Sequence, residues 1–147
     1  MPTQELGDPQ LKLDASTFVA DPDLIQALKK SSVPVFCAES RVLFLQGDPS
    51  VGLYILDSGV VTLTMNSENA VPIVSVRVAP ASLLGLPALV GNQPYTLTAI
   101  AQSGARLSFI TREDFNALMQ NDPLMALKVL QVLAAEVRSA RNAILQR

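Results

Sequence analysis

Histidine and tryptophan are absent from this chain, and cysteine occurs only once. The lack of histidine removes the commonest general base, the commonest transition-metal ligand and any Ser/His/Asp triad. A histidine-dependent enzyme and a metal-bound barrel are therefore disfavoured, and we expect neither a catalytic nor a metal site. The single Cys37 cannot form an internal disulfide, and the apolar run around it favours a buried free thiol.

Long apolar runs and an excess of one charge are also missing. The run at residues 83–90 is broken by glycine and proline well before the roughly 20 residues that a membrane span requires. The N-terminus has no basic stretch followed by an apolar run, as a signal peptide has. A formal net charge of -2 argues against broad attraction to nucleic acid or anionic lipid. We expect a cytoplasmic chain that does not contact a membrane.

What the chain does have is enough apolar sequence for one folded domain. Apolar residues make up 49% of its 147 residues and charged residues 16%, which lies outside the range of disordered chains. Residues 1–20 mix proline, glycine and polar residues without periodicity, so we expect a flexible N-terminal arm there. Residues 21–147 form the predicted domain.

Short β-branched and aromatic runs, separated by turn residues, fill the chain between residues 33 and 110. Several of these runs alternate, so that one face of each strand packs and the other is solvated. Regularly spaced strands of this kind indicate an antiparallel sandwich or roll. The predicted strands are residues 42–45, 53–56, 60–65, 73–78, 96–101 and 105–110.

Helical patterns flank the strands on both sides. A helix over 22–31 is predicted, with Asp21 as its N-cap and proline at its first position. A second helix starts after Thr111, in a sequence that resembles a capping box. A third helix covers 123–147 and is capped by Asp122.

The last helix carries six residues, all but one of them apolar, at alternating spacings of three and four, as a coiled-coil seam does. We therefore expect a homodimer that pairs through helix 123–147; the alternative is a helix that packs only on its own domain. A protein partner is a further expected interaction. The residues of this seam are Leu127, Leu130, Ala134, Val137, Arg141 and Ile144.

Three segments resemble the cyclic nucleotide-binding domain family, which includes the bacterial catabolite activator regulators. Residues 41–48 resemble the family's strand ending in Gly-Asp, and residues 52–60 resemble its tyrosine strand, which runs to a Ser-Gly hairpin. Residues 78–101 occupy the place of its phosphate-binding cassette. The resemblance implies a mainly β fold, an antiparallel β-roll (a double-stranded β-helix jelly roll) with an N-terminal helix and a long C-terminal helix.

The cassette departs from the family pattern, in which a Gly-Glu pair binds ribose and an Arg-Ser or Arg-Thr pair binds the cyclic phosphate. Gly85 is retained, but Leu86 stands at the glutamate position and Tyr95 at the arginine position, followed by Thr96. Pro87 removes a backbone N–H from the helix start. The resemblance thus implies these ligand-binding residues, if any ligand binds: Gly85, Leu86, Pro87, Ala88, Tyr95 and Thr96.

We interpret two acids and two arginines near these motifs as structural residues and not as ligand-binding residues. Asp48 and Asp57 each lie beside a turn glycine, where aspartate favours hydrogen bonds to the backbone. Arg77 and Arg106 lie on strands near the cassette and could bring a guanidinium to a phosphate, but we expect both to lie on solvated strand faces.

The leading hypothesis is a stand-alone regulatory or ligand-sensing module, dimeric and not an enzyme, with weak or lost cyclic nucleotide binding. Its apolar cassette is either plugged by side chains or lines a pocket for an uncharged or apolar effector. The alternative is a genuine cAMP- or cGMP-binding protein that acts in signal transduction or as the effector domain of a transcription regulator. Because the sequence ends at Arg147, without the helix-turn-helix module of the family's regulators, direct DNA binding is not expected.

Overall fold

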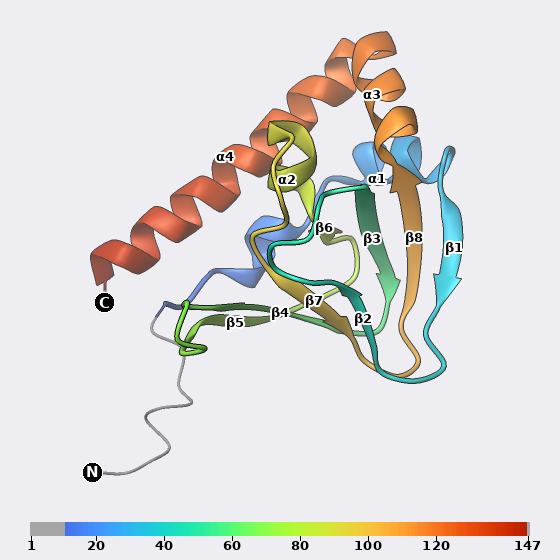
Figure 1. The fold of residues 1–147 in the computed structure, drawn as a ribbon. Helices are drawn as coiled ribbons and strands as arrows, with labels where there is room; N and C mark the ends of the chain where they lie inside the picture. The colour runs from blue at the N-terminus through green and yellow to red at the C-terminus, as the bar shows by residue number, and fades with distance from the viewer. Residues whose placement is uncertain (1–10, 147) are drawn as a thin grey trace, which may run out of the picture.

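The computed structural model describes residues 11–146, which form two four-stranded sheets flanked by helices (Figure 1). In chain order, the elements are η2 (Ala15–Phe18), α1 (Pro22–Lys29), β1 (Val33–Phe36), β2 (Arg41–Phe44), β3 (Gly52–Ser58), β4 (Val61–Asn66), β5 (Pro72–Val78), β6 (Leu83–Leu84), α2 (Leu86–Gly91), β7 (Thr98–Ala101), β8 (Arg106–Thr111), α3 (Arg112–Asn121) and α4 (Pro123–Gln146).

The sheets have the strand orders β1-β8-β3-β6 and β2-β7-β4-β5, and neighbouring strands in both are antiparallel. Helix α4 runs along one side of the roll and passes α2 (Figure 1). The predicted fold class, an antiparallel β-roll with an N-terminal helix and a long C-terminal helix, is confirmed. Among residues 11–146, no helix has both the length and the apolar character needed to cross a membrane.

Each of the six predicted strands occurs, with boundaries shifted by one or two residues at most ends, whereas β1 and β6 were not predicted. β1 contains Pro34, which cannot donate to a ladder and so argues against an interior strand. In the roll it lies at a sheet edge, paired only with β8, where proline is tolerated. β6 has two residues, too few to show an alternating pattern.

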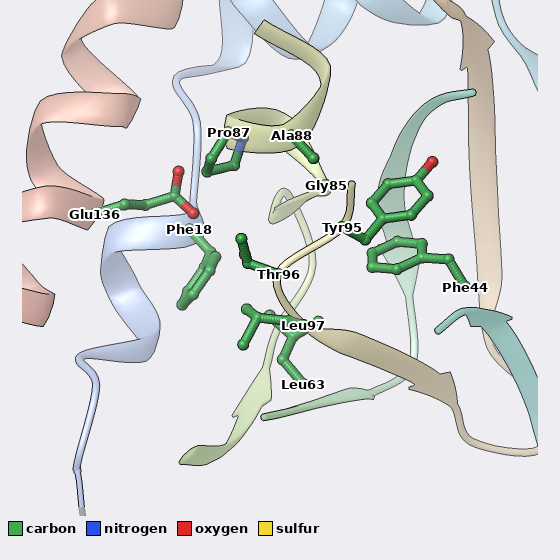
Figure 2. A pocket seen from close by; sticks show the side chains of 10 residues that line it. All are labelled: Phe18, Phe44, Leu63, Gly85, Pro87, Ala88, Tyr95, Thr96, Leu97 and Glu136. Carbon is green, nitrogen blue, oxygen red and sulfur yellow. The ribbon is translucent and has the colours of Figure 1, made fainter. Parts of the chain in front are cut away.

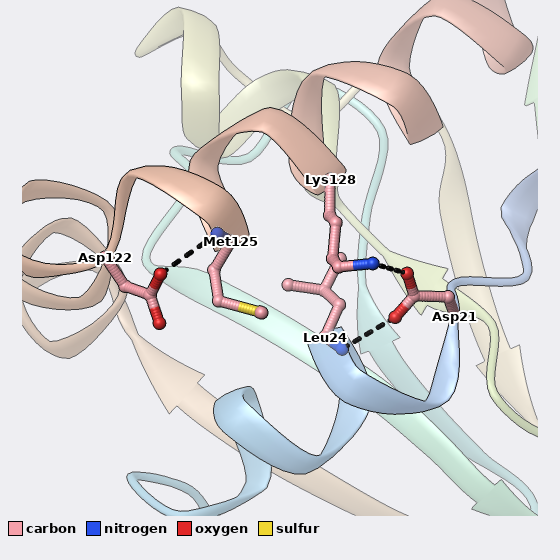
Figure 3. Close-up of polar contacts among 5 residues, drawn as sticks. All are labelled: Asp21, Leu24, Asp122, Met125 and Lys128. Carbon is pink, nitrogen blue, oxygen red and sulfur yellow. Dashed lines mark hydrogen bonds and ion pairs between the residues drawn. The ribbon is translucent and has the colours of Figure 1, made fainter.

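The three predicted helix caps are present. Asp21 accepts a hydrogen bond from the Leu24 N–H at 2.9 Å, and Asp122 accepts one from the Met125 N–H at 3.3 Å (Figure 3). Thr111 caps α3 in the same way. Asp21 also pairs with Lys128, which joins the start of α1 to α4 (Figure 3).

Two apolar clusters form the core. One lies within the roll, and the other joins β3 and β8 to α1, α2, α3 and α4. Residues 11–20, expected to belong to a flexible arm, pack on the roll: Leu11 bridges to Val74, and Phe18 is 5% exposed. Residues 1–10, the other half of that predicted arm, lie outside the described residues.

Candidate functional site

The cassette begins with a backbone turn that only glycine accommodates well. Gly85, between β6 and α2, has a φ of 94°, in the left-handed region. A Cβ at this position would lie 2.8 Å from Cε1 of Tyr95. Gly85 is therefore required both by its conformation and by the closeness of the Tyr95 ring.

Tyr95 is buried, and both its ring and its hydroxyl contact other residues of the domain. Its ring stacks on Phe44 with centroids 3.9 Å apart and planes 13° apart. Its hydroxyl donates to the Gly52 carbonyl at 2.9 Å and accepts from the Val51 N–H at 3.2 Å. Its backbone N–H also bonds to the Asp48 carbonyl. The side chain at the family's arginine position thus fills space and has its polar atom satisfied inside the protein.

The cassette cavity is small. It is enclosed between the roll, η2, α2 and α4, and it leaves about 30 Å³ for the centres of water-sized molecules, which is room for one or two waters. Pockets that hold drug-sized ligands usually measure roughly 300–1,000 Å³. The side chains around it are drawn in Figure 2; they are Phe18, Phe44, Leu63, Gly85, Pro87, Ala88, Tyr95, Thr96, Leu97 and Glu136.

Five of the six cassette residues singled out from the sequence line this cavity, and Leu86 does not. Leu86 is fully buried in the cluster beneath the helices, with Val129 and Ile110. The position assigned to the family's ribose-binding glutamate therefore faces the helical core. α2 carries no polar side chain at all, since its sequence is Leu-Pro-Ala-Leu-Val-Gly.

Glu136, which the sequence analysis missed, reaches into the cavity from α4 (Figure 2). Its Oε2 atom is buried and has no hydrogen-bond partner. Burial raises the pKa of this carboxyl to about 8, because the charged form loses its water. A signal was available: Glu136 continues the four-and-three spacing of Met125, Val129 and Val132, the buried face of α4.

Phe18 was also missed, because it lies in the segment interpreted as an arm. It lines the cavity opposite the cassette, and it packs in the cluster within the roll. A lone aromatic residue in a polar segment carries no periodicity that would mark it as core. Its burial follows from tertiary contacts alone.

None of the arginines among residues 11–146 lines the cavity. Arg77 is exposed, and the guanidinium of Arg106 lies 4.7 Å from the ring centroid of Phe36, so the predicted solvated strand faces are confirmed. Arg112 donates to the carbonyls of Leu89 and Ser50, at 3.1 and 2.6 Å. These two hydrogen bonds link α2 to the loop before β3, and Arg112 does not line the cavity.

The acids and the cysteine do not form a second site. Asp48 accepts from the Leu45 N–H at 3.2 Å, as predicted for a turn acid. Asp57 instead lies in β3, where its carboxylate accepts from Ser108 and pairs with Lys29 at 3.0 Å; the prediction of a backbone-bonded turn acid was wrong there. Cys37 is a buried free thiol. Within residues 11–146, no group of three metal-ligating side chains comes together.

Comparison with known proteins gives one family. The model of the cyclic nucleotide-binding domain matches residues 34–122. A "CRP-like cAMP-activated global transcriptional regulator" of Mycobacterium tuberculosis is 25% identical over 122 residues, 83% of this chain and 54% of that protein. The "Cyclic AMP receptor protein" of Thermus thermophilus is 28% identical over 102 residues, 69% of this chain and 47% of that protein. This chain therefore spans about half the length of these relatives.

Solved structures agree on the fold. The catabolite activator protein of Thermus thermophilus matches with a TM-score of 0.74 at 24% identity, over 84% of this chain and 58% of that chain. Its likeness extends beyond the residues that the family model matches.

Proposed function

The chain belongs to the cyclic nucleotide-binding domain family, and we propose that it is a dimeric cytoplasmic regulatory module, not an enzyme, whose cassette binds cyclic nucleotides weakly or not at all. The observation that carries the proposal is Tyr95. Its ring occupies the cassette against Phe44, and its hydroxyl is bound to Gly52. A cyclic phosphate would find no guanidinium among the residues that line the cavity.

The expected loss of affinity is large. A hydrogen bond to a charged group contributes roughly 1.5–3 kcal/mol, and a tenfold change in affinity is about 1.4 kcal/mol. Without the arginine and glutamate contacts, affinity would fall on the order of a hundredfold to ten-thousandfold. The one ionisable acid on the cavity wall, Glu136, offers a phosphate no positive charge in either protonation state.

The alternative is a genuine cyclic nucleotide-binding protein, and the names of both relatives favour it, since each refers to cyclic AMP. For this alternative to hold, Tyr95 and Phe18 would have to leave the cavity, because about 30 Å³ does not admit a nucleotide. The two buried side chains, each at most 5% exposed, would then lose their packing.

Isothermal titration of the full chain with cyclic AMP and cyclic GMP separates the two candidates. We expect no saturable heat in the micromolar range with either nucleotide. Adenosine, which lacks the phosphate, serves as a control for binding through the base alone. Micromolar binding of either cyclic nucleotide would overturn the proposal in favour of the alternative.

The dimer proposal is supported by the two faces of α4. The face toward the domain is buried, with Val129 at 3% exposure, whereas Leu130 and Val137 of the seam are 57% and 66% exposed. The remaining members of the seam are exposed as well. This row, which is apolar except at Arg141, is not buried by its own domain, and its coiled-coil spacing fits a second copy of the same helix.

Val137→Glu should shift the sedimentation of the protein toward the monomer, because it places a charge in the centre of the seam. Gln131→Glu is the matched control: it adds the same charge on an exposed position of α4 outside the seam and should leave sedimentation unchanged. A wild-type protein that sediments as a monomer at all concentrations, or a Val137→Glu variant that still dimerises, would contradict the proposed interface.

A further inference from the structure

The cavity behind the altered cassette has an unusual combination of walls. Most of its side chains are apolar. The polar groups are the Thr96 hydroxyl, the Tyr95 hydroxyl, which is already hydrogen-bonded, and one carboxyl group, that of Glu136. In Figure 2, Glu136 extends toward Pro87 and Phe18, while the hydroxyl of Tyr95 lies on the far side of the cavity. A ligand here would therefore meet hydrocarbon on most sides and one acid.

No hydrogen bond within the protein, and no charge on the helix and loop segments that face Glu136, balances that acid. Oε2 of Glu136 is buried without a hydrogen-bond donor. The neighbouring segments, residues 15–18, 86–91 and 92–97, contain no charged residue. The closest acid before them, Asp14, directs its carboxylate to the N–H and hydroxyl of Ser16. A buried acceptor of this kind is costly to leave unpaired, so its retention in the cavity favours a ligand that donates to it.

We propose that the cassette cavity binds a compact organic cation, a short aliphatic primary amine whose ammonium group pairs with the Glu136 carboxylate. The inference rests on the proposed function, because it assigns an effector class to the same site. An ammonium offers three donors to the carboxylate and carries the charge opposite to that of a cyclic phosphate. The short alkyl chain would lie against Phe18, Leu63 and Leu97.

Size and protonation constrain the ligand further. The small cavity admits an ammonium and a few carbons only if the partly buried Leu97 yields, so short chains bind better than long ones. Burial raises the pKa of Glu136 to about 8, so the empty site holds a proton at neutral pH. When the ammonium ion binds, the carboxyl loses this proton to the buffer and the ion pair forms.

Thermal unfolding and isothermal titration of the full chain test the proposal with n-butylamine as the probe, beside n-butanol and butyrate at equal concentration and ionic strength. Butylamine should raise the midpoint of wild-type unfolding by a few degrees, and butyrate should not. Titrations at pH 7 in buffers of different ionisation enthalpy should show the release of about one proton per amine bound.

Two variants keep the test independent of folding defects. Glu136→Gln, which keeps the shape of the side chain, should lose the response to butylamine. Leu97→Ala, which enlarges the cavity from a partly buried position, should respond to hexylamine more than wild type does. No response of wild type to butylamine, an equal response of Glu136→Gln, or an equal effect of butanol would overturn the proposal.

A titration of the same samples with cyclic AMP distinguishes a failure of the amine proposal from a failure of the proposed function. If neither amine nor cyclic AMP binds, the amine inference is wrong and the lost nucleotide affinity stands. If cyclic AMP binds in the micromolar range, the proposed function is wrong and the amine inference falls with it.

Discussion

Replacing Glu136 with glutamine should abolish a pH-dependent loss of stability that the wild-type protein shows between pH 5 and pH 7. Burial raises the pKa of the Glu136 carboxyl from 4.5 to about 8 in the folded protein. Across this interval the folded chain keeps a proton that the unfolded chain has released. Stability is therefore greatest below the unfolded pKa and falls as the pH rises toward the folded pKa.

The magnitude follows from proton linkage. When the folded state binds one proton more than the unfolded state, the free energy of unfolding falls by up to about 1.36 kcal/mol for each unit by which the pH rises. Between pH 5 and pH 7 the loss is then roughly 2–3 kcal/mol, a large fraction of the stability of a small domain. Glutamine has no proton to lose, so the variant should show no such loss from this position.

Urea denaturation at pH 5 and pH 7, at one fixed protein concentration, measures the effect in both proteins. The difference between wild type and Glu136→Gln cancels the contributions of other titrating groups. The same change in stability between pH 5 and pH 7 in the wild type and in the variant would refute the assignment of Glu136 as a buried, protonated acid.

Further predictions concern the residues that hold the cassette and the helices, each measured by urea denaturation. Gly85→Ala should cost on the order of 1–3 kcal/mol, since its positive φ is strained for alanine and the new methyl group meets Tyr95; an unchanged midpoint would contradict the geometry. Tyr95→Phe should cost about 1–3 kcal/mol, because the Gly52 carbonyl loses its donor; a neutral result would mean that the carbonyl finds water. Asp21→Ala should cost about 1 kcal/mol as a lost cap. The Lys128 ammonium and the Leu24 N–H lower the pKa of Asp21, so the contribution of Asp21 should be present at neutral pH and lost as the pH falls below its ordinary value of 3.8; Asp21→Asn, which still caps, should retain most of the stability at pH 7.

Local signals in the sequence predicted most of the fold. Gly47 and Gly59 have φ angles of 93° and 92°, as expected for glycines at strand reversals. The caps at Asp21 and Asp122 were readable because aspartate followed by proline is typical of a helix start. β1 was missed for the corresponding reason, since Pro34 contradicts a strand unless the edge position is known.

The candidate site was less accessible from the sequence. Tyr95 was identified through the family pattern, but its stack on Phe44 joins residues that are far apart in the chain. Leu86 was expected at the cavity, yet the direction of a side chain on a six-residue helix depends on packing against α4. Glu136 has a helical spacing that marks it as buried, but its polarity led to its omission from the apolar set.

The most direct test of the account is the titration of the full chain with cyclic AMP at neutral pH. We expect no saturable binding in the micromolar range, because the side chains of Tyr95 and Phe18 fill the cassette cavity and no guanidinium lines it. Saturable micromolar binding would show that these side chains leave the cavity at little cost, and it would contradict the central claim.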